Sequence, residues 1–131
     1  MADGGCLCGA VRYRFSGTPS SSANCHCRSC RRASGAPVVA WITVQKSELS
    51  ILSGIPADYH SSPGVTRQFC SQCGSALTYA IERHPDRIDI TTASLDYPDD
   101  YPPTSEVWLE HRLTWQPTSP DTQKFEAFSS D

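Results

Sequence analysis

The sequence predicts a mainly β protein with one short helix. Short segments rich in Val, Ile, Thr and aromatic residues recur along the chain, and several of them alternate apolar with polar residues. Turn-forming residues separate these segments, including many of the 8 glycines and 10 prolines. A chain of 131 residues is long enough for one modest core. We therefore expect a single domain over residues 1–131.

The expected strands follow in chain order. Residues 10–15 alternate apolar and polar side chains and end at a Ser-Gly-Thr-Pro turn. Residues 29–33 are the helix candidate, because Gly35 and Pro37 stop any continuation. The remaining expected strands are 38–44, 49–52, 66–69, 76–81, 87–92 and 107–113.

Two segments are expected to be irregular. Residues 96–103 contain three prolines, which lack the backbone donor that a strand requires. The tail after about residue 117 is rich in Pro, Ser, Thr and Asp, so we expect it to be partly irregular. Within this tail, Phe125 and Phe128 are able to dock on the body of the protein.

Seven cysteines form two pairs and one triplet: Cys6 and Cys8; Cys25, Cys27 and Cys30; Cys70 and Cys73. Cysteines at such spacings chelate one metal ion but rarely form good disulfides with each other, because disulfide geometry is strict. Four plus three thiolates suit one closed tetrahedral zinc site and one zinc site with an open position. Residues 1–5 lack the basic start and apolar stretch of a secretory signal. We therefore expect a reducing compartment and a cytoplasmic location.

Charge and hydropathy argue against two classes of partner. The net charge is −3 and the isoelectric point is near 5.7, whereas nucleic-acid binding usually requires a basic face. The local exception is the cluster Arg28, Arg31 and Arg32. No apolar run approaches the roughly 20 residues that cross a bilayer. We expect neither nucleic-acid nor membrane binding.

Three cysteine motifs occur in a specific order: Gly5-Cys6-Leu7-Cys8-Gly9-Ala10-Val11-Arg12-Tyr13, Cys25-His26-Cys27-Arg28-Ser29-Cys30-Arg31 and Arg67-Gln68-Phe69-Cys70-Ser71-Gln72-Cys73-Gly74-Ser75. In order and spacing they resemble the glutathione-dependent formaldehyde-activating enzyme family, which also contains centromere protein V. The resemblance extends over about residues 4–125. The sequence departs from the family pattern at Ala93 and at Glu106, where many members have glycine and histidine.

The resemblance implies an Mss4-like β fold with two zinc ions. The structural zinc would be held by Cys6, Cys8, Cys70 and Cys73, and the catalytic zinc by Cys25, Cys27 and Cys30. The residues alone favour the same division, because two distant pairs close a tetrahedron while three nearby thiolates leave it incomplete. The alternative is a second closed site with His26 as fourth ligand. In an extended backbone, however, the His26 side chain would point away from its two neighbours.

An open zinc position suits a thiol ligand, because the metal deprotonates a thiol whose free pKa is near 8.5. The resemblance implies addition of glutathione thiolate to formaldehyde. We predict the broader class: a carbon–sulfur lyase or transferase acting on a small thiol or thioether adduct, such as a glutathione conjugate. The alternatives are a non-catalytic zinc-binding module for protein interaction and, less favoured, a thiol redox protein.

Four residues around the triplet are candidates for substrate binding: Asn24, His26, Ser29 and Arg31. Arg31 suits a substrate carboxylate, and Asn24 and Ser29 suit hydrogen bonds to the cysteine sulfurs. Capping of the short helix is the simpler role for Ser29. We expect four aromatic residues to be core residues and three histidines to be non-ligands: Tyr13, Trp41, Trp108 and Trp115; His60, His84 and His111.

Overall fold

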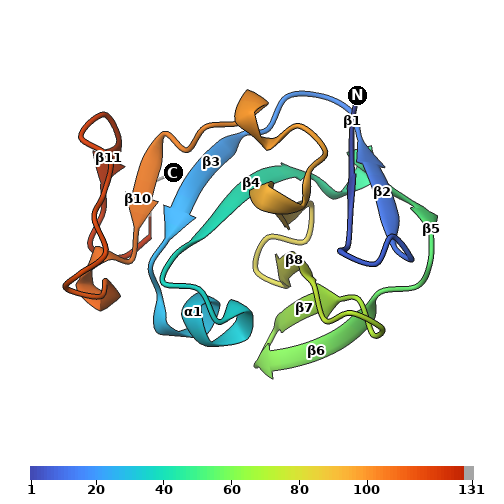
Figure 1. Ribbon diagram of the computed structural model, residues 1–131, viewed down its shortest axis with the longest axis horizontal. Coiled ribbons are helices and arrows are strands. Elements are labelled where there is room, and N and C mark those ends of the chain that lie inside the picture. The colour runs from blue at the N-terminus through green and yellow to red at the C-terminus, as the bar shows by residue number, and fades with distance from the viewer. Residues whose placement is uncertain (129–131) are drawn as a thin grey trace.

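The computed structural model describes residues 1–128 as two β-sheets with one short α-helix (Figure 1). The smaller sheet has the order β1-β2-β5, formed by Ala2–Gly5, Arg12–Phe15 and Leu49–Ser53. Both of its pairings are antiparallel. The mainly β, Mss4-like fold with one short helix that the sequence predicts is therefore confirmed.

The larger sheet has eight strands in the order β11-β10-β3-β4-β9-β8-β7-β6. In that order the strands are Gln123–Lys124, Ser105–Val107, Ser21–Cys25, Val39–Gln45, Arg87–Thr91, Ala76–Ile81, Val65–Phe69 and Ala57–Ser62. The pairings from β3 to β6 are antiparallel, whereas β10 runs parallel to both of its neighbours.

The two faces of the larger sheet have different roles. On one face, alternate residues of β4 and β9 pack with the small sheet in the main core, which includes Ile42, Val44, Ile88 and Ile90 together with Tyr13 and Phe15. The other face carries the side chains that alternate with these, because neighbouring residues of a strand point to opposite sides. Trp41 and Thr43 of β4 lie on this second face and line a cavity.

The helix α1, Arg28–Ser34, begins immediately after β3 and starts at a cysteine. Cys27 is the N-cap, and its sulfur accepts a hydrogen bond from the Cys30 amide at 3.2 Å. Gly35 ends the helix in the left-handed conformation at φ 71°, and its amide donates to the Arg31 carbonyl at 2.7 Å. The sequence-based stop at Gly35 is confirmed, but Cys27 and not Ser29 caps the helix.

Several strand predictions need correction. Residues 107–113 do not form a strand: pairing ends at Val107, Trp108 has a positive φ of 58°, and Leu109–His111 form a 3-10 turn. The sequence analysis missed β1, β3, β6, β11 and all of β10 except Val107. Of these, β3 and β6 consist mostly of polar or small residues. Strand β6 lies at the sheet edge with mostly exposed side chains, so it lacks the alternation that identifies a half-buried strand.

Other expectations about individual segments are confirmed in part. Residues 96–103 contain no strand and include a 3-10 turn at Pro98–Asp100. Tyr13 and Trp41 are buried, but Trp115 is 68% exposed, so its assignment to the core is wrong. In the tail, the Phe128 ring packs edge-on against Trp108 with ring centres 4.8 Å apart. No helix within residues 1–128 has the length and apolar character needed to span a membrane.

Candidate metal centres and substrate cavity

Cys6, Cys8, Cys70 and Cys73 converge so that their sulfurs all lie within 4.8 Å of one another. The sulfurs of Cys6 and Cys8 are 3.6 Å apart, and those of Cys8 and Cys70 are 3.8 Å apart. A tetrahedron of thiolates with metal–sulfur bonds of about 2.3 Å has sulfur–sulfur distances of about 3.8 Å. A disulfide would require about 2.05 Å. All four cysteines are free, and the cluster fits one tetrahedrally held metal ion.

Two similar turns deliver these four sulfurs. The turn after β1 and the turn between β7 and β8 each end in a glycine at φ 81°, Gly9 and Gly74. Their amides donate to the carbonyls of Cys6 at 3.2 Å and Cys70 at 2.8 Å. The left-handed backbone favours glycine at both positions. The paired turns therefore join the small sheet to the large one through the cluster.

Cys25, Cys27 and Cys30 form the second cluster, with all three sulfurs within 4.8 Å. Cys25 is the last residue of β3, Cys27 caps α1, and Cys30 lies in the first turn of α1. Hydrogen bonds with Cys25 and Cys30 lower the pKa of the Cys27 thiol. Hydrogen bonds with Cys27 and Cys30 raise the pKa of the Cys25 thiol. Three thiols that share protons in this way can become a set of three metal ligands when a cation binds.

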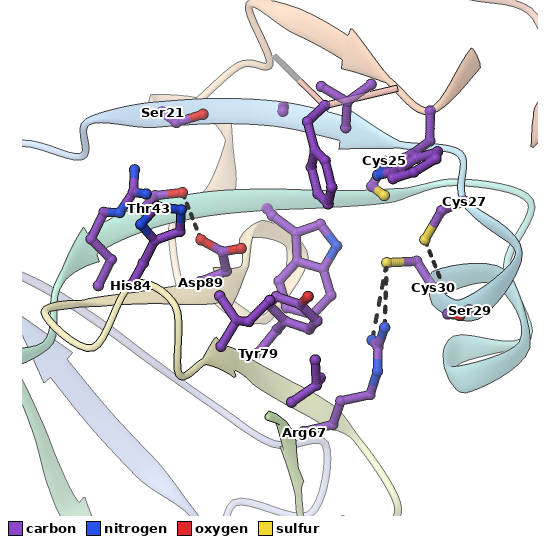
Figure 2. A pocket seen from close by; sticks show the side chains of 18 of the residues that line it. Ser21, Cys25, Cys27, Ser29, Cys30, Thr43, Arg67, Tyr79, His84 and Asp89 are labelled. Carbon is purple, nitrogen blue, oxygen red and sulfur yellow. Dashed lines mark hydrogen bonds between the residues drawn. The ribbon is translucent and has the colours of Figure 1, made fainter. Parts of the chain in front are cut away.

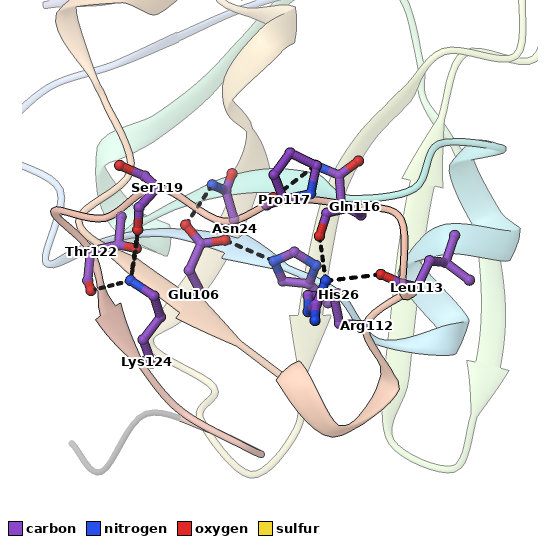
Figure 3. Close-up of polar contacts among 10 residues, drawn as sticks. All are labelled: Asn24, His26, Glu106, Arg112, Leu113, Gln116, Pro117, Ser119, Thr122 and Lys124. Carbon is purple, nitrogen blue, oxygen red and sulfur yellow. Dashed lines mark hydrogen bonds and ion pairs between the residues drawn. The ribbon is translucent and has the colours of Figure 1, made fainter.

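His26 lies between two members of the triplet, yet it is not part of their cluster. Figure 3 shows its ring directed toward Glu106. The ring is fully buried, and Nε2 lies 2.7 Å from Oε1 of the buried Glu106. Asn24 Nδ2 donates to the other oxygen of Glu106 at 3.1 Å. His26 is therefore outside the sulfur cluster, as backbone alternation predicts, and Asn24 donates to a carboxylate and not to a cysteine sulfur.

A cavity of about 730 Å³ opens beside the triplet on the second face of the larger sheet (Figure 2). This volume suits an organic ligand of moderate size. Its floor includes one residue from each of five adjacent strands, all at the same level of the pairing register: Ser21, Thr43, Asp89, Tyr79 and Arg67. The floor thus leads across the sheet from β3 to β7, with the triplet at one end of the cavity.

Arg67 places a positive charge next to the triplet. Its Nη1 and Nη2 atoms lie 4.0 and 3.9 Å from the Cys30 sulfur, and its Nε donates to Ser61 at 3.2 Å. The guanidinium also lies over the Tyr79 ring, 5.0 Å from the ring centre. Stacking and the Ser61 contact fix the orientation of the guanidinium, so Arg67 can both stabilise thiolate charge and contact an anionic group of a ligand.

One wall of the cavity is aromatic. The rings of Trp108 and His111 stack with centres 5.1 Å apart, and Phe128 packs edge-on against Trp108. Trp108 is the one non-glycine residue with positive φ among residues 1–128. The left-handed conformation is unfavourable for a bulky side chain, and such strain is common at ligand sites. This backbone turn presents the Trp108 ring to the cavity.

The charge around the cavity is opposite in sign to that of the whole chain. Four arginines and one aspartate line it, whereas the complete sequence has a net charge of −3. The arginines are Arg28, Arg67, Arg83 and Arg87. A positive cavity in an acidic protein favours a ligand that carries carboxylates.

Only one of the four residues predicted to bind substrate lines the cavity. Ser29 lines the cavity, whereas Asn24, His26 and Arg31 do not. Arg67, Tyr79, Asp89 and Trp108 line it, and sequence reasoning did not identify them as candidate site residues. The available signal was the alternation within the predicted strands, since Arg67, Tyr79 and Asp89 each lie on the face opposite the main core.

The comparisons with known proteins agree with the cysteine pattern. The model of the family described as glutathione-dependent formaldehyde-activating enzyme matches residues 1–111. The chain belongs to this family. A Halomonas elongata protein whose name carries the same assignment is 30% identical over 125 residues, covering 88% of this chain and 79% of that protein.

Two further proteins are similar to this chain, one in sequence and one in structure. An uncharacterised lyase of Schizosaccharomyces pombe is 32% identical over 78 residues, covering 60% of this chain and 56% of the lyase. The crystal structure of a Rhodobacter sphaeroides protein superposes with a TM-score of 0.60 at 25% identity, covering 72% of this chain and 87% of that one. The family hit and the lyase relative indicate an enzyme-like function related to glutathione.

Proposed function

We propose that this protein is a zinc-dependent carbon–sulfur lyase or transferase that acts on a thiol or thioether adduct such as a glutathione conjugate. One observation carries the proposal: three thiols, with no fourth cysteine, histidine or carboxylate in their cluster among residues 1–128, lie beside a cavity lined by four arginines. In this proposal Cys6, Cys8, Cys70 and Cys73 hold a structural zinc, and Cys25, Cys27 and Cys30 hold a catalytic one. The sulfur–sulfur distances in the first cluster support zinc there.

When bound at the triplet, zinc would supply an open coordination position at which a substrate thiol is held as its thiolate. The protein's own residues do the rest. Arg67 lies next to the triplet and would orient an anionic group of the substrate. The ring centres of Trp41 and Tyr79 are 6.1 Å apart, and the two rings form an apolar part of the cavity floor. This apolar surface would exclude water from the substrate sulfur.

The proposed reaction balances as a simple addition or its reverse. In the forming direction, a thiol loses its proton, the sulfur electron pair forms a bond to a carbonyl carbon, and the carbonyl oxygen takes up a proton. In the cleaving direction the hydroxyl loses its proton, the carbonyl re-forms as the carbon–sulfur bond breaks, and the sulfur takes up a proton. No oxidant or reductant is needed. The cavity beside the triplet supports this reading over a non-catalytic zinc module, for which a closed second site would be sufficient.

Proton release on thiol binding tests the proposal. Glutathione is titrated into the zinc-loaded protein by calorimetry in two buffers that differ in ionisation enthalpy. We expect about one proton to be released, because the thiol is mostly protonated at pH 7 and would bind as thiolate. Cys27→Ser should abolish this release, while the exposed Arg32→Gln should leave it unchanged. Binding of glutathione without proton release, or equal release by Cys27→Ser, would overturn the proposal.

A further inference from the structure

Asp89 is the one acidic residue that lines the cavity among residues 1–128. It lies on β9, in register with Thr43 of β4 and Tyr79 of β8. Its Oδ1 accepts a hydrogen bond from the Thr43 hydroxyl at 2.6 Å. Figure 2 shows the carboxylate between Thr43 and Tyr79, away from the cysteine end of the cavity. The Asp89 carboxylate is therefore part of the cavity floor and not of the metal cluster.

Asp89 has no cationic partner within ion-pair distance in the described part of the chain. Burial raises the pKa of its carboxyl, and the Thr43 hydrogen bond and the more distant charge of Arg87 only partly counteract this effect. A desolvated carboxylate is costly unless a partner satisfies it. The main core does not use this carboxylate, so a cation or strong donor supplied by the ligand would be its natural partner.

Arg87 provides the complementary charge at a suitable spacing. It precedes Asp89 by two residues on β9, so both side chains project from the same face, roughly 7 Å apart along the strand. Both residues line the cavity, and His84 on the preceding turn lines it as well. Among residues 1–128, these two side chains form no ion pair with each other. Their spacing therefore leaves room for a zwitterion between them.

The dimensions of an α-amino acid fit this gap. Its ammonium nitrogen and carboxylate oxygens are about 3 Å apart, and each charge-assisted hydrogen bond adds about 2.8 Å. We propose that Asp89 and Arg87 bind the free α-amino acid group of the substrate, with the ammonium on Asp89 and the carboxylate on Arg87. This proposal rests on the proposed function in that the substrate sulfur lies at the triplet.

The two ends of the cavity also define a length. Cys25 lies on β3 and Asp89 on β9, with β4 between them. Cys25 pairs with Val39 of β4, and Asp89 pairs with Thr43 of β4, four residues further along. In a flat sheet these steps place the two Cα atoms roughly 16 Å apart. Cysteine itself is too short for this span. The substrate is therefore a thiol or thioether in which a spacer separates the sulfur from the amino acid group, as the γ-glutamyl arm does in glutathione.

Two analogues test each charge separately. 4-Carboxybutanoyl-Cys-Gly is glutathione without the ammonium, and 4-aminobutanoyl-Cys-Gly is glutathione without the carboxylate of the γ-glutamyl group. Affinities are measured for the zinc-loaded protein by calorimetry. We expect each analogue to bind about tenfold or more weakly than glutathione, since each loses one charged hydrogen-bonding group.

Matched variants identify the side chains responsible. Asp89→Asn should bind glutathione and the analogue without the ammonium equally, yet still discriminate against the analogue without the carboxylate. Arg87→Gln should show the opposite pattern. Asp89→Asn is expected to fold, because asparagine can still accept the Thr43 hydrogen bond and removes a desolvated charge. Equal affinity of the wild-type protein for all three ligands, or unchanged discrimination in both variants, would overturn the inference.

The same measurements distinguish this inference from the proposed function. S-Methylglutathione and its two S-methyl analogues have no thiol proton to release, so their relative affinities report only on the amino acid end. If Cys27→Ser loses proton release but keeps these affinity ratios, both proposals stand. If wild-type protein shows the ratios without any proton release from glutathione, the amino acid site stands and the catalytic assignment fails. Proton release with equal affinities for the three ligands means that only the amino acid site fails.

Discussion

Nε2 of His26 lies 2.7 Å from Oε1 of Glu106, and both side chains are almost completely excluded from solvent. His26 lies between Cys25 and Cys27, while Glu106 lies on β10, which pairs with β3. The contact therefore anchors the segment that carries the cysteine triplet from the side opposite the cavity. Asn24 strengthens this anchor through the second carboxylate oxygen.

Replacement of Glu106 should destabilise the protein more than replacement of an exposed glutamate. Glu106→Leu leaves His26 Nε2 and Asn24 Nδ2 buried without their acceptor, and we expect a loss of about 3 kcal/mol in the free energy of unfolding. Urea denaturation measures this loss. Glu110→Leu, at an exposed position, is the control and should change stability by less than about 0.5 kcal/mol. Equal effects of the two substitutions would show that the anchor is unimportant.

The two cysteine clusters should differ in their importance for folding. Cys73→Ser removes a ligand from the cluster that joins the two sheets, so we expect loss of one metal ion and a large drop in thermal stability. Cys27→Ser should also lose one ion but keep the β-sheet signature in circular dichroism, because the first cluster and the main core remain. Metal content and thermal melting of both variants check this. A Cys73→Ser protein that melts like wild type with two bound zinc ions would contradict the assignment.

Arg67 should contribute through the geometry of its guanidinium as well as through its charge. Arg67→Lys keeps the charge but loses the planar fork that lies over Tyr79 and approaches the Cys30 sulfur. We expect affinity for glutathione to fall about tenfold, measured by calorimetry. Exposed Arg32→Lys is the matched control and should bind normally. Wild-type affinity in Arg67→Lys would limit the role of this residue to its charge.

Tyr13 gives a prediction for alkaline pH. Burial raises the pKa of its phenol to about 12, from about 10 in the unfolded chain, and its hydroxyl contacts Ser94 at 2.7 Å. The contribution of Tyr13 to the free energy of unfolding is complete below pH 10 and is lost as the pH rises to 12. In this window the Tyr13 phenol ionises in the unfolded chain but not in the folded protein. The loss is on the order of 3 kcal/mol.

Tyr13→Phe removes the ionisable hydroxyl and isolates this effect. Its free energy of unfolding should decline less steeply between pH 10 and 12 than that of the wild-type protein. Urea denaturation at several pH values measures the two slopes. Any constant difference caused by loss of the Ser94 contact cancels in this comparison. Parallel pH profiles for the two proteins would exclude Tyr13 as the titrating group.

The sequence made the two cysteine pairs and the triplet predictable, because the members of each group are close in the chain and their chemistry is specific. It also predicted the direction of His26, since alternation is a local property of an extended backbone. The cavity floor was not predictable in this way. Asp89 and Arg67 approach the same cavity only through the register of the three strands β9, β8 and β7, and register depends on contacts between distant segments.

The failed predictions have local physical causes. Tryptophan is usually well buried, which favours a core position for Trp115, but its side chain is 68% exposed. Strand β6 was missed because an exposed edge strand needs no buried face. The apolar character of residues 107–113 suggested a strand, whereas the left-handed backbone at Trp108 ends the pairing after Val107.

The separation of the two cysteine clusters along the chain determines the order in which the molecule can be assembled. The triplet lies within six residues, so an incompletely folded chain can already hold an ion there at little cost in chain entropy. Cys8 and Cys70 are 62 residues apart, and their approach requires both sheets to be nearly in place. The cavity floor requires pairing from β3 to β7. Under the proposed function, a newly made chain would therefore be able to capture zinc at the triplet before the substrate cavity has formed.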